Sequence, residues 1–213
     1  ALQQGVHQDE KGSFADQLSQ LNDWLTLSGT ESGETVFPTP IPPLPPEGFV
    51  LGASVQSAQI AAQFNWHFIF AAHLNGDRAL LRDVLSFWQT HSARPTIVAV
   101  QVIVADSNDT AAQLAENVQI WGVELENGQR VTVASEEQAL AFAAQAGSPP
   151  RKIARREQAL LHGTAQEVMA KLNALHTQFG IEEFIIDTPV AEGHARLTSL
   201  RLLAQAHNAV EVL

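Results

Sequence analysis

Residues 49–64, FVLGASVQSAQIAAQF, decide how this chain folds. The apolar run FVL predicts a strand, which reaches a turn of the small residues GAS. A helix pattern begins at once, because apolar residues recur at helical spacing from Ile60 to Phe64. Ser54 fits the N-cap of that helix, where its hydroxyl can accept from a backbone N–H. The stretch therefore predicts a strand that enters a helix through a tight turn.

This turn has the chemistry of a phosphate site. The first N–H groups of a helix lack partners in the helix and carry the positive end of its dipole. Gly52 allows close approach of the backbone to an anion. Ser54 and Ser57 add two hydroxyls one helical turn apart. A purely structural turn has the same pattern, so the residues alone leave both interpretations open.

Composition narrows the class of protein. The chain has 213 residues, enough for one sizeable core or two small ones. Its net charge of −11 argues against nucleic acid or an anionic membrane as a partner. The absence of cysteine excludes disulfides and thiolate metal sites, and we expect no metal. Neither a signal peptide nor an apolar run of about 18 residues is present, which indicates a cytoplasmic protein.

Residues 1–48 precede the strand and hold a predicted helix and a proline-rich connection. The helix pattern begins at Phe14, and Ser13 fits its N-cap. Residues 28–48 contain six prolines, a composition that forbids a helix or a central strand. We interpret this segment as a surface connection, in preference to a PxxP ligand.

Residues 49–213 read as four strand–helix units in a single domain. We expect four strands to lie parallel and adjacent in the following order, with helices on one side: 49–52, 67–73, 96–105 and 183–187. The third, TIVAVQVIVA, is apolar almost throughout, as is typical of a covered parallel sheet. Repeated units of this kind predict an α/β fold, either doubly wound or a (β/α)8 barrel.

Residues 121–157 interrupt this repeat. Residues 131–133 fit a short strand or an extended loop, and Ser135 fits the N-cap of a helix. The basic run RKIARR at 151–156 fits either a solvated face or an anion site, and we favour the solvated face.

Five segments together resemble the bacterial luciferase-like flavin monooxygenases. In chain order they are LGASVQSAQIAAQ, HFIFAAHL, VQVIVADSNDTAAQLA, HGTAQEVMAKLNAL and EEFIIDTPVAEGHARLTSLRLLAQA. The resemblance covers roughly residues 10–210 and implies a TIM barrel of the (β/α)8 type. It places 1–213 in the C-terminal part of that barrel, with only strands five to eight represented. The family's first half has no counterpart, and residues 121–157 match little.

The resemblance also implies a cofactor and a site. Reduced FMN is expected as co-substrate, with its phosphate in the turn formed by Ala53, Ser54, Val55 and Ser57. His73 matches a position that faces the flavin or the substrate, and we name it as the candidate catalytic residue. A histidine that only satisfies the end of a strand is the alternative for it. His194 and Arg196 are expected to fix the last loop and helix.

The implied function is oxidation of a small organic substrate by reduced FMN and O2, with a flavin reductase as supplier. A homo-oligomer is possible, and neither nucleic acid nor membrane is expected. The alternatives are a flavin-binding or structural protein without turnover, an inactive fragment, or a phosphate-binding enzyme of another class. We also expect additional chain, because half a barrel would expose the inner residues of 67–73 and 96–105 to water.

Overall fold

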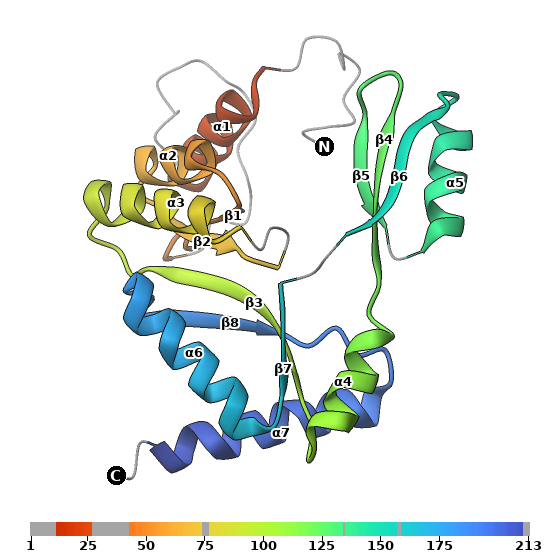
Figure 1. Cartoon of the computed structure of the whole chain (residues 1–213). Coiled ribbons are helices and arrows are strands. Elements are labelled where there is room, and N and C mark those ends of the chain that lie inside the picture. Colours follow the sequence, from red (N-terminus) through yellow and green to blue (C-terminus); the bar gives the residue numbers. More distant parts are fainter. Residues whose placement is uncertain (1–11, 27–42, 74–76, 134, 157–158, 211–213) are drawn as a thin grey trace.

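A computed structural model describes residues 12–26, 43–73, 77–133, 135–156 and 159–210. This part of the chain holds seven helices and eight strands (Figure 1). In chain order they are α1 (Phe14–Thr26), β1 (Phe49–Gly52), α2 (Val55–Gln63), β2 (His67–Ala71), α3 (Arg78–His91), β3 (Ile97–Val104), α4 (Asn108–Glu116), β4 (Ile120–Leu125), β5 (Arg130–Val133), α5 (Glu136–Gln145), β6 (Pro150–Arg156), β7 (Leu160–Gly163), α6 (Ala165–Phe179), β8 (Glu183–Asp187) and α7 (Gly193–Val210).

The main sheet is parallel, and the predicted order of its strands is confirmed. β1 pairs with β2, β2 with the first half of β3, and β3 with β8, all in parallel. Val50 lies opposite Phe68, and Phe70 lies opposite Val98. The chain is therefore an α/β protein, and the barrel is not closed by the described residues, among which β1 pairs only with β2 and β8 only with β3.

The prediction of only four parallel strands was wrong. β7 is a fifth, and it pairs with β3 from Gln101 to Val104. Its four residues, LLHG, are too few to show a period in sequence, and pairing with the long β3 is what makes them a strand. The strand predicted at 67–73 ends at Ala71, because the Ala72 N–H turns back to the Phe70 carbonyl at 3.1 Å.

Four helices cover one face of this sheet, as predicted. Alternate strand residues point to them and form the main core. These are Val50, Phe68, Phe70, Val98, Val100, Val102 and Val104. α2, α3, α6 and α7 supply the facing side chains, among which Trp88 is fully buried against Phe68 with ring centroids 5.6 Å apart.

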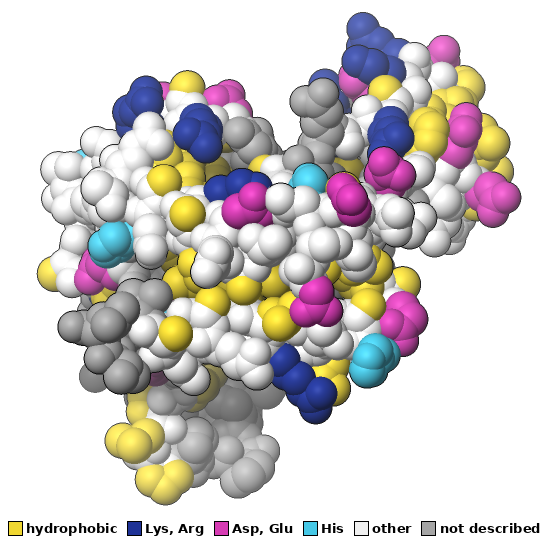
Figure 2. Space-filling model, turned by 60° about the horizontal axis from the view of Figure 1, so that its bottom comes forward, with side chains coloured by type: hydrophobic (Ala, Val, Ile, Leu, Met, Phe, Trp, Pro, Cys, Tyr) yellow, Lys and Arg dark blue, Asp and Glu magenta, His cyan; other side chains and the backbone are white. Residues whose placement is uncertain are grey.

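The opposite face is more closed than we predicted. Ile69, Ile97 and Ala99 are buried there and form a small cluster of their own. The expected exposure of the inner residues of β2 and β3 is therefore wrong. These strands are flanked by neighbours, whereas β1 and β8 lie at the margins, where Leu51 is 56% and Ile185 40% exposed. Figure 2 shows hydrophobic side chains in a band across one face of the molecule.

The segment between α4 and β7 forms a second, antiparallel sheet in the order β5-β4-β6 (Figure 1). α5 packs on one face of it, with Val123, Leu125, Ala139 and Ala143 as the buried centre. Of the two alternatives for 131–133, a short strand or an extended loop, the structure shows the strand, as part of β5. The RKIARR run forms most of strand β6, an element that was not predicted, and its four Lys and Arg residues are exposed, which is compatible with either a solvated face or an anion site.

Capping residues mark the helix starts, and those predicted at Ser13, Ser54 and Ser135 are confirmed. Ser54, Asp77, Ser107, Ser135 and Thr164 each accept from a backbone N–H of the first turn. Ser13 accepts from the Asp16 N–H at 3.2 Å and begins α1 in the same way. The proline-rich connection lies mostly at 27–42, outside the described residues. None of the described helices has the length and hydropathy needed to cross a membrane.

Candidate functional site

The turn between β1 and α2 has the predicted form. Ser54 is extended at φ −147°, and its hydroxyl accepts from the Ser57 N–H at 3.2 Å. The two hydroxyl oxygens lie 2.9 Å apart, so one donates to the other and one hydroxyl hydrogen remains for a further acceptor. The four predicted residues, Ala53, Ser54, Val55 and Ser57, are thus brought together at one half-buried turn.

Gly52 is required by this geometry. A Cβ at Gly52 would lie 2.5 Å from both the Cβ and the Oγ of Ser57. Any side chain would therefore push Ser57 and the start of α2 away from β1. The glycine keeps the helix N-terminus close to the end of the strand.

Two backbone amides remain available at this turn. Ser57 N–H is bonded to Ser54, and Ala58 N–H donates to the Ser54 carbonyl at 3.2 Å. Within the described part of the chain, the Val55 and Gln56 N–H groups make no hydrogen bond. Two free N–H groups, a free hydroxyl hydrogen and the helix dipole are together a suitable site for an anion.

Two buried polar atoms at the carboxyl ends of the strands also lack partners. His73 follows β2, and Thr188 follows β8. Neither His73 Nδ1 nor Thr188 Oγ1 has a hydrogen-bond partner among the described residues. Leaving such an atom unpaired costs about 1–3 kcal/mol, so a group that binds at this edge would offset that cost.

These atoms share the edge of the sheet with the β1–α2 turn, because the carboxyl ends of parallel strands meet on one side. The sequence singled out His73 by resemblance. It did not single out Thr188, whose only signal is its place directly after the strand. The edge therefore combines a turn suited to an anion with two polar atoms that have no partner among the described residues.

Comparison with known proteins identifies relatives, although no family model matches the chain. N-acetyl-S-alkylcysteine monooxygenase of Bacillus subtilis (strain 168) is 29% identical over 199 residues, which make up 91% of this chain and 59% of that enzyme. Apo-MsnO8 has a TM-score of 0.65 at 21% identity, covering 94% of this chain and 62% of that one. Monooxygenase RslO1 from Streptomyces bottropensis has a TM-score of 0.59 at 17% identity, covering 95% of this chain and 62% of that one.

This chain is a relative of the luciferase-like flavin monooxygenases. The resemblance in sequence is confirmed by the curated enzyme, and the two solved structures share the fold. The chain spans 59% and 50% of the length of the two curated relatives that it matches.

A polar pair that the sequence did not predict lies on the main sheet of this chain. Gln101 on β3 and Asp187 on β8 are partners in register, and the Gln101 amide donates to the Asp187 carboxylate at 2.9 Å. On β3, Gln101 follows Ile97 and Ala99 at alternate positions, so it lies on the face opposite the four helices. Only the register between two distant strands brings Gln101 and Asp187 together.

Arg196 ties the last loop to the last helix through its side chain, whereas His194 contributes only its backbone N–H. The Arg196 Nε donates to the Val190 carbonyl at 2.8 Å, which ties the loop to α7. The His194 side chain is exposed, and its backbone N–H donates to the Glu192 carboxylate at 2.8 Å. The Ala195 N–H, at 2.6 Å, and then the His194 N–H hold the pKa of Glu192 below its usual value.

Proposed function

We propose that this chain supplies the flavin-binding part of an FMN-dependent monooxygenase that uses reduced FMN and O2 to oxidise a small organic molecule. The observation that carries the proposal is the anion-ready turn at Ser54 and Ser57, located at the carboxyl edge of the sheet in a relative of known monooxygenases. A soluble cytoplasmic enzyme is consistent with the composition.

The residues of the turn fit the FMN phosphate. The Val55 and Gln56 N–H groups would donate to phosphate oxygens, and the hydroxyl of Ser54 or Ser57 would add a third bond. Ala53 has a side chain small enough to leave the approach from β1 open. Gly52 keeps this cradle compact, because a Cβ there would displace Ser57.

When bound, reduced FMN supplies the electrons that activate O2 for transfer of one oxygen atom to the substrate. The protein then has to bind the reactants, orient them and exclude water. His73 Nδ1 and Thr188 Oγ1 are the buried polar atoms free to hydrogen-bond the flavin or the substrate at the same edge. His73 is our candidate for the residue nearest the reacting atoms.

The relative's name suggests the substrate class. N-acetyl-S-alkylcysteine monooxygenase is named for a thioether that carries an amide and a carboxylate. We propose a thioether acid of this kind as substrate, with a separate flavin reductase as the source of reduced FMN. One oxygen atom of O2 would go to the sulfur and the other to water, and the products would be the sulfoxide, water and oxidised FMN.

The open margins of the sheet support a domain proposal. The chain would form the C-terminal part of a luciferase-like barrel, with residues 1–48 as a helix and connection and 49–213 as the strand–helix units. β1 and β8 each have one strand partner among the described residues, so both could accept further parallel strands. Their exposed side chains, including Phe49 and Leu51, would be covered by such strands.

The test is FMN binding followed by turnover. FMN is titrated into the purified chain, and its fluorescence gives the dissociation constant. The chain is then supplied with a flavin reductase, NADH, FMN and N-acetyl-S-butylcysteine, and the sulfoxide is measured by mass spectrometry. Binding with oxygenated product supports the proposal. FMN binding without product would favour flavin binding without turnover, and absence of binding would overturn the proposed site.

A further inference from the structure

A hollow lies between α4, β6 and the start of β7, away from the β1–α2 turn. Its volume is about 660 Å³, within the range of small-molecule pockets. The residues that line it and carry the argument are Ala112, Ala115, Val118, Leu160, Arg155 and Arg156. Glu116 and His162 complete the lining. One wall is therefore apolar and another is cationic.

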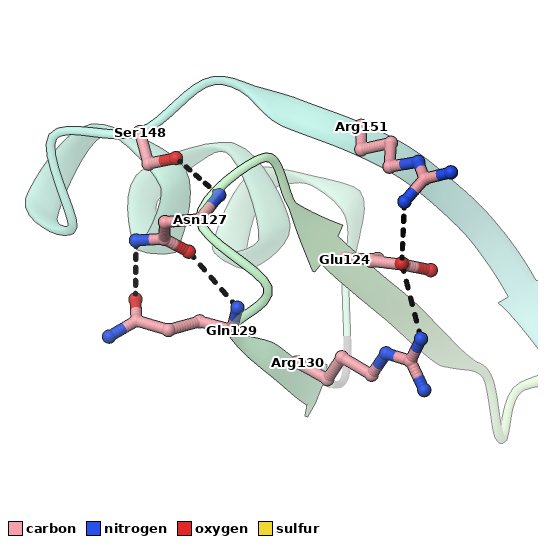
Figure 3. A network of polar contacts seen from close by, with 6 residues as sticks. All are labelled: Glu124, Asn127, Gln129, Arg130, Ser148 and Arg151. Carbon is pink, nitrogen blue, oxygen red and sulfur yellow. Dashed lines mark hydrogen bonds and ion pairs between the residues drawn. The ribbon is translucent and has the colours of Figure 1, made fainter.

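The two arginines of this hollow have no acidic partner in the part of the chain that the structure describes. Within the described chain, neither Arg155 nor Arg156 makes an ion pair. The neighbouring Arg130 and Arg151 differ, since both contact the Glu124 carboxylate, at 3.2 and 3.6 Å (Figure 3). The second sheet thus has two arginines in an ion-pair network and two that line the hollow and make no ion pair with the described residues.

The position of Arg156 depends on a glycine. Gly122 on β4 is buried, and a Cβ at this position would collide with the Arg156 guanidinium. Lack of a side chain at Gly122 therefore lets the arginine lie across β4. A second hollow, lined by Gly122, Ala154 and both arginines, adjoins the same guanidinium groups.

Charge is distributed unevenly along this chain. The net charge is −11, yet five of the twelve Lys and Arg residues fall between residues 120 and 156. Four Glu residues lie in the same segment, so its net charge is +1 (five positive minus four negative), and an anion is repelled less by this segment than by the rest of the chain. Among the described residues that line the hollow, Glu116 is the one carboxylate, and it faces two arginines in the balance of charge.

We infer that this hollow binds a small organic carboxylate with an apolar body. The guanidinium groups of Arg155 and Arg156 suit a carboxylate, which they can bind through two parallel N–H donors. The wall formed by Val118 and Leu160 suits an alkyl chain. The inference that the hollow binds an apolar carboxylate rests on its lining residues alone. The choice of an N-acetyl-S-alkylcysteine as that carboxylate rests on the proposed function.

Isothermal titration of the flavin-free chain with N-acetyl-S-butylcysteine tests this inference. Arg155→Ala combined with Arg156→Ala should weaken binding about tenfold or more, because two charge-assisted contacts are lost. Gly122→Ala should weaken it several-fold while keeping every charge. Arg151→Ala is the matched control, since it removes one charge from the same strand outside the hollow, and binding should be unchanged.

The methyl ester of the same ligand tests the role of the carboxylate. It should bind about tenfold more weakly than the acid to the native chain, and equally weakly to the double variant. Circular dichroism shows whether each variant is folded. If the double variant is not folded, Arg156→Lys, which keeps the charge but loses the planar pair of donors, is measured in its place. No binding of the acid, equal binding of acid and ester, or an equal loss in Arg151→Ala would each overturn the inference.

The FMN titration separates this inference from the proposed function. If the chain binds FMN but not the carboxylate, the inference about the hollow is refuted and the proposed flavin site stands. If the chain binds the carboxylate but not FMN, the proposed function is refuted and the inference about the hollow stands.

Discussion

Ser54 and Ser57 lie one helical turn apart at the start of α2, with their hydroxyl oxygens at 2.9 Å. The same arrangement occurs at the start of α4, where Ser107 and Thr110 hydroxyls are also 2.9 Å apart. The two helix starts differ in place: α2 follows the margin strand β1, and α4 follows the long strand β3. This pair of matched caps allows the binding role of a serine to be separated from its structural role.

Ser54→Ala should weaken FMN binding by roughly 1–3 kcal/mol, the cost of a lost hydrogen bond to a charged group. It should also lower the free energy of unfolding by about 1 kcal/mol, because the cap of α2 is lost. Fluorescence titration and urea denaturation measure the two effects. Ser107→Ala should cost similar stability and leave FMN affinity unchanged. An unchanged FMN dissociation constant in Ser54→Ala combined with Ser57→Ala would contradict the site.

Gly52→Ala should destabilise the protein by roughly 1–3 kcal/mol, since the new Cβ overlaps Ser57. The start of α2 would move away from β1, and FMN affinity should fall with it. Thermal denaturation and FMN titration check both expectations. Gly193→Ala is the control, because nothing lies within 4 Å of a Cβ at that glycine. Equal stability of the two variants would refute the argument of close approach.

Thr188→Val should keep or raise stability, since it removes a buried hydroxyl without a partner among the described residues. Ser199→Ala is the matched control: its buried hydroxyl accepts from the Val104 N–H at 2.8 Å, and its loss should cost about 1–3 kcal/mol. Chemical denaturation compares them. If Thr188→Val costs as much as Ser199→Ala, the Thr188 hydroxyl has a partner and cannot be free for a ligand.

Glu192 should make stability depend on pH. Because hydrogen bonds lower its pKa in the folded state, its contribution is present above the ordinary value of 4.5 and is lost as the pH falls through the lowered value. Glu192→Gln should therefore be less stable than the native chain at neutral pH, with the difference shrinking below pH 4.5. Melting temperatures from neutral pH to pH 3 measure this trend. A difference that stays constant over that range would contradict it, and Glu183→Gln serves as an exposed control.

Local features were predictable because they depend on residues close in sequence. The β1–α2 turn requires small residues at 52–54, which the sequence GAS supplies. It also requires a capping side chain three residues before the N–H that it accepts from, and Ser54 and Ser57 have that spacing. The caps at Asp77 and Thr164 follow the same rule. The order of β1, β2 and β3 could be predicted since consecutive strand–helix units place successive strands side by side.

The register of the strands and the identity of the strands at the sheet margins could not be predicted from the sequence, because both depend on pairing between distant segments. β3 pairs with β2, β7 and β8, so the four residues of β7 become a strand and Gln101 meets Asp187, 86 positions away. The same pairings bury Ile69 and Ile97 and leave Leu51 exposed at the margin. Residue types determined the turn that could bind a phosphate. Only the tertiary structure decided which polar atoms and arginines have no partner among the described residues, since a partner is available only where the fold brings one within bonding distance.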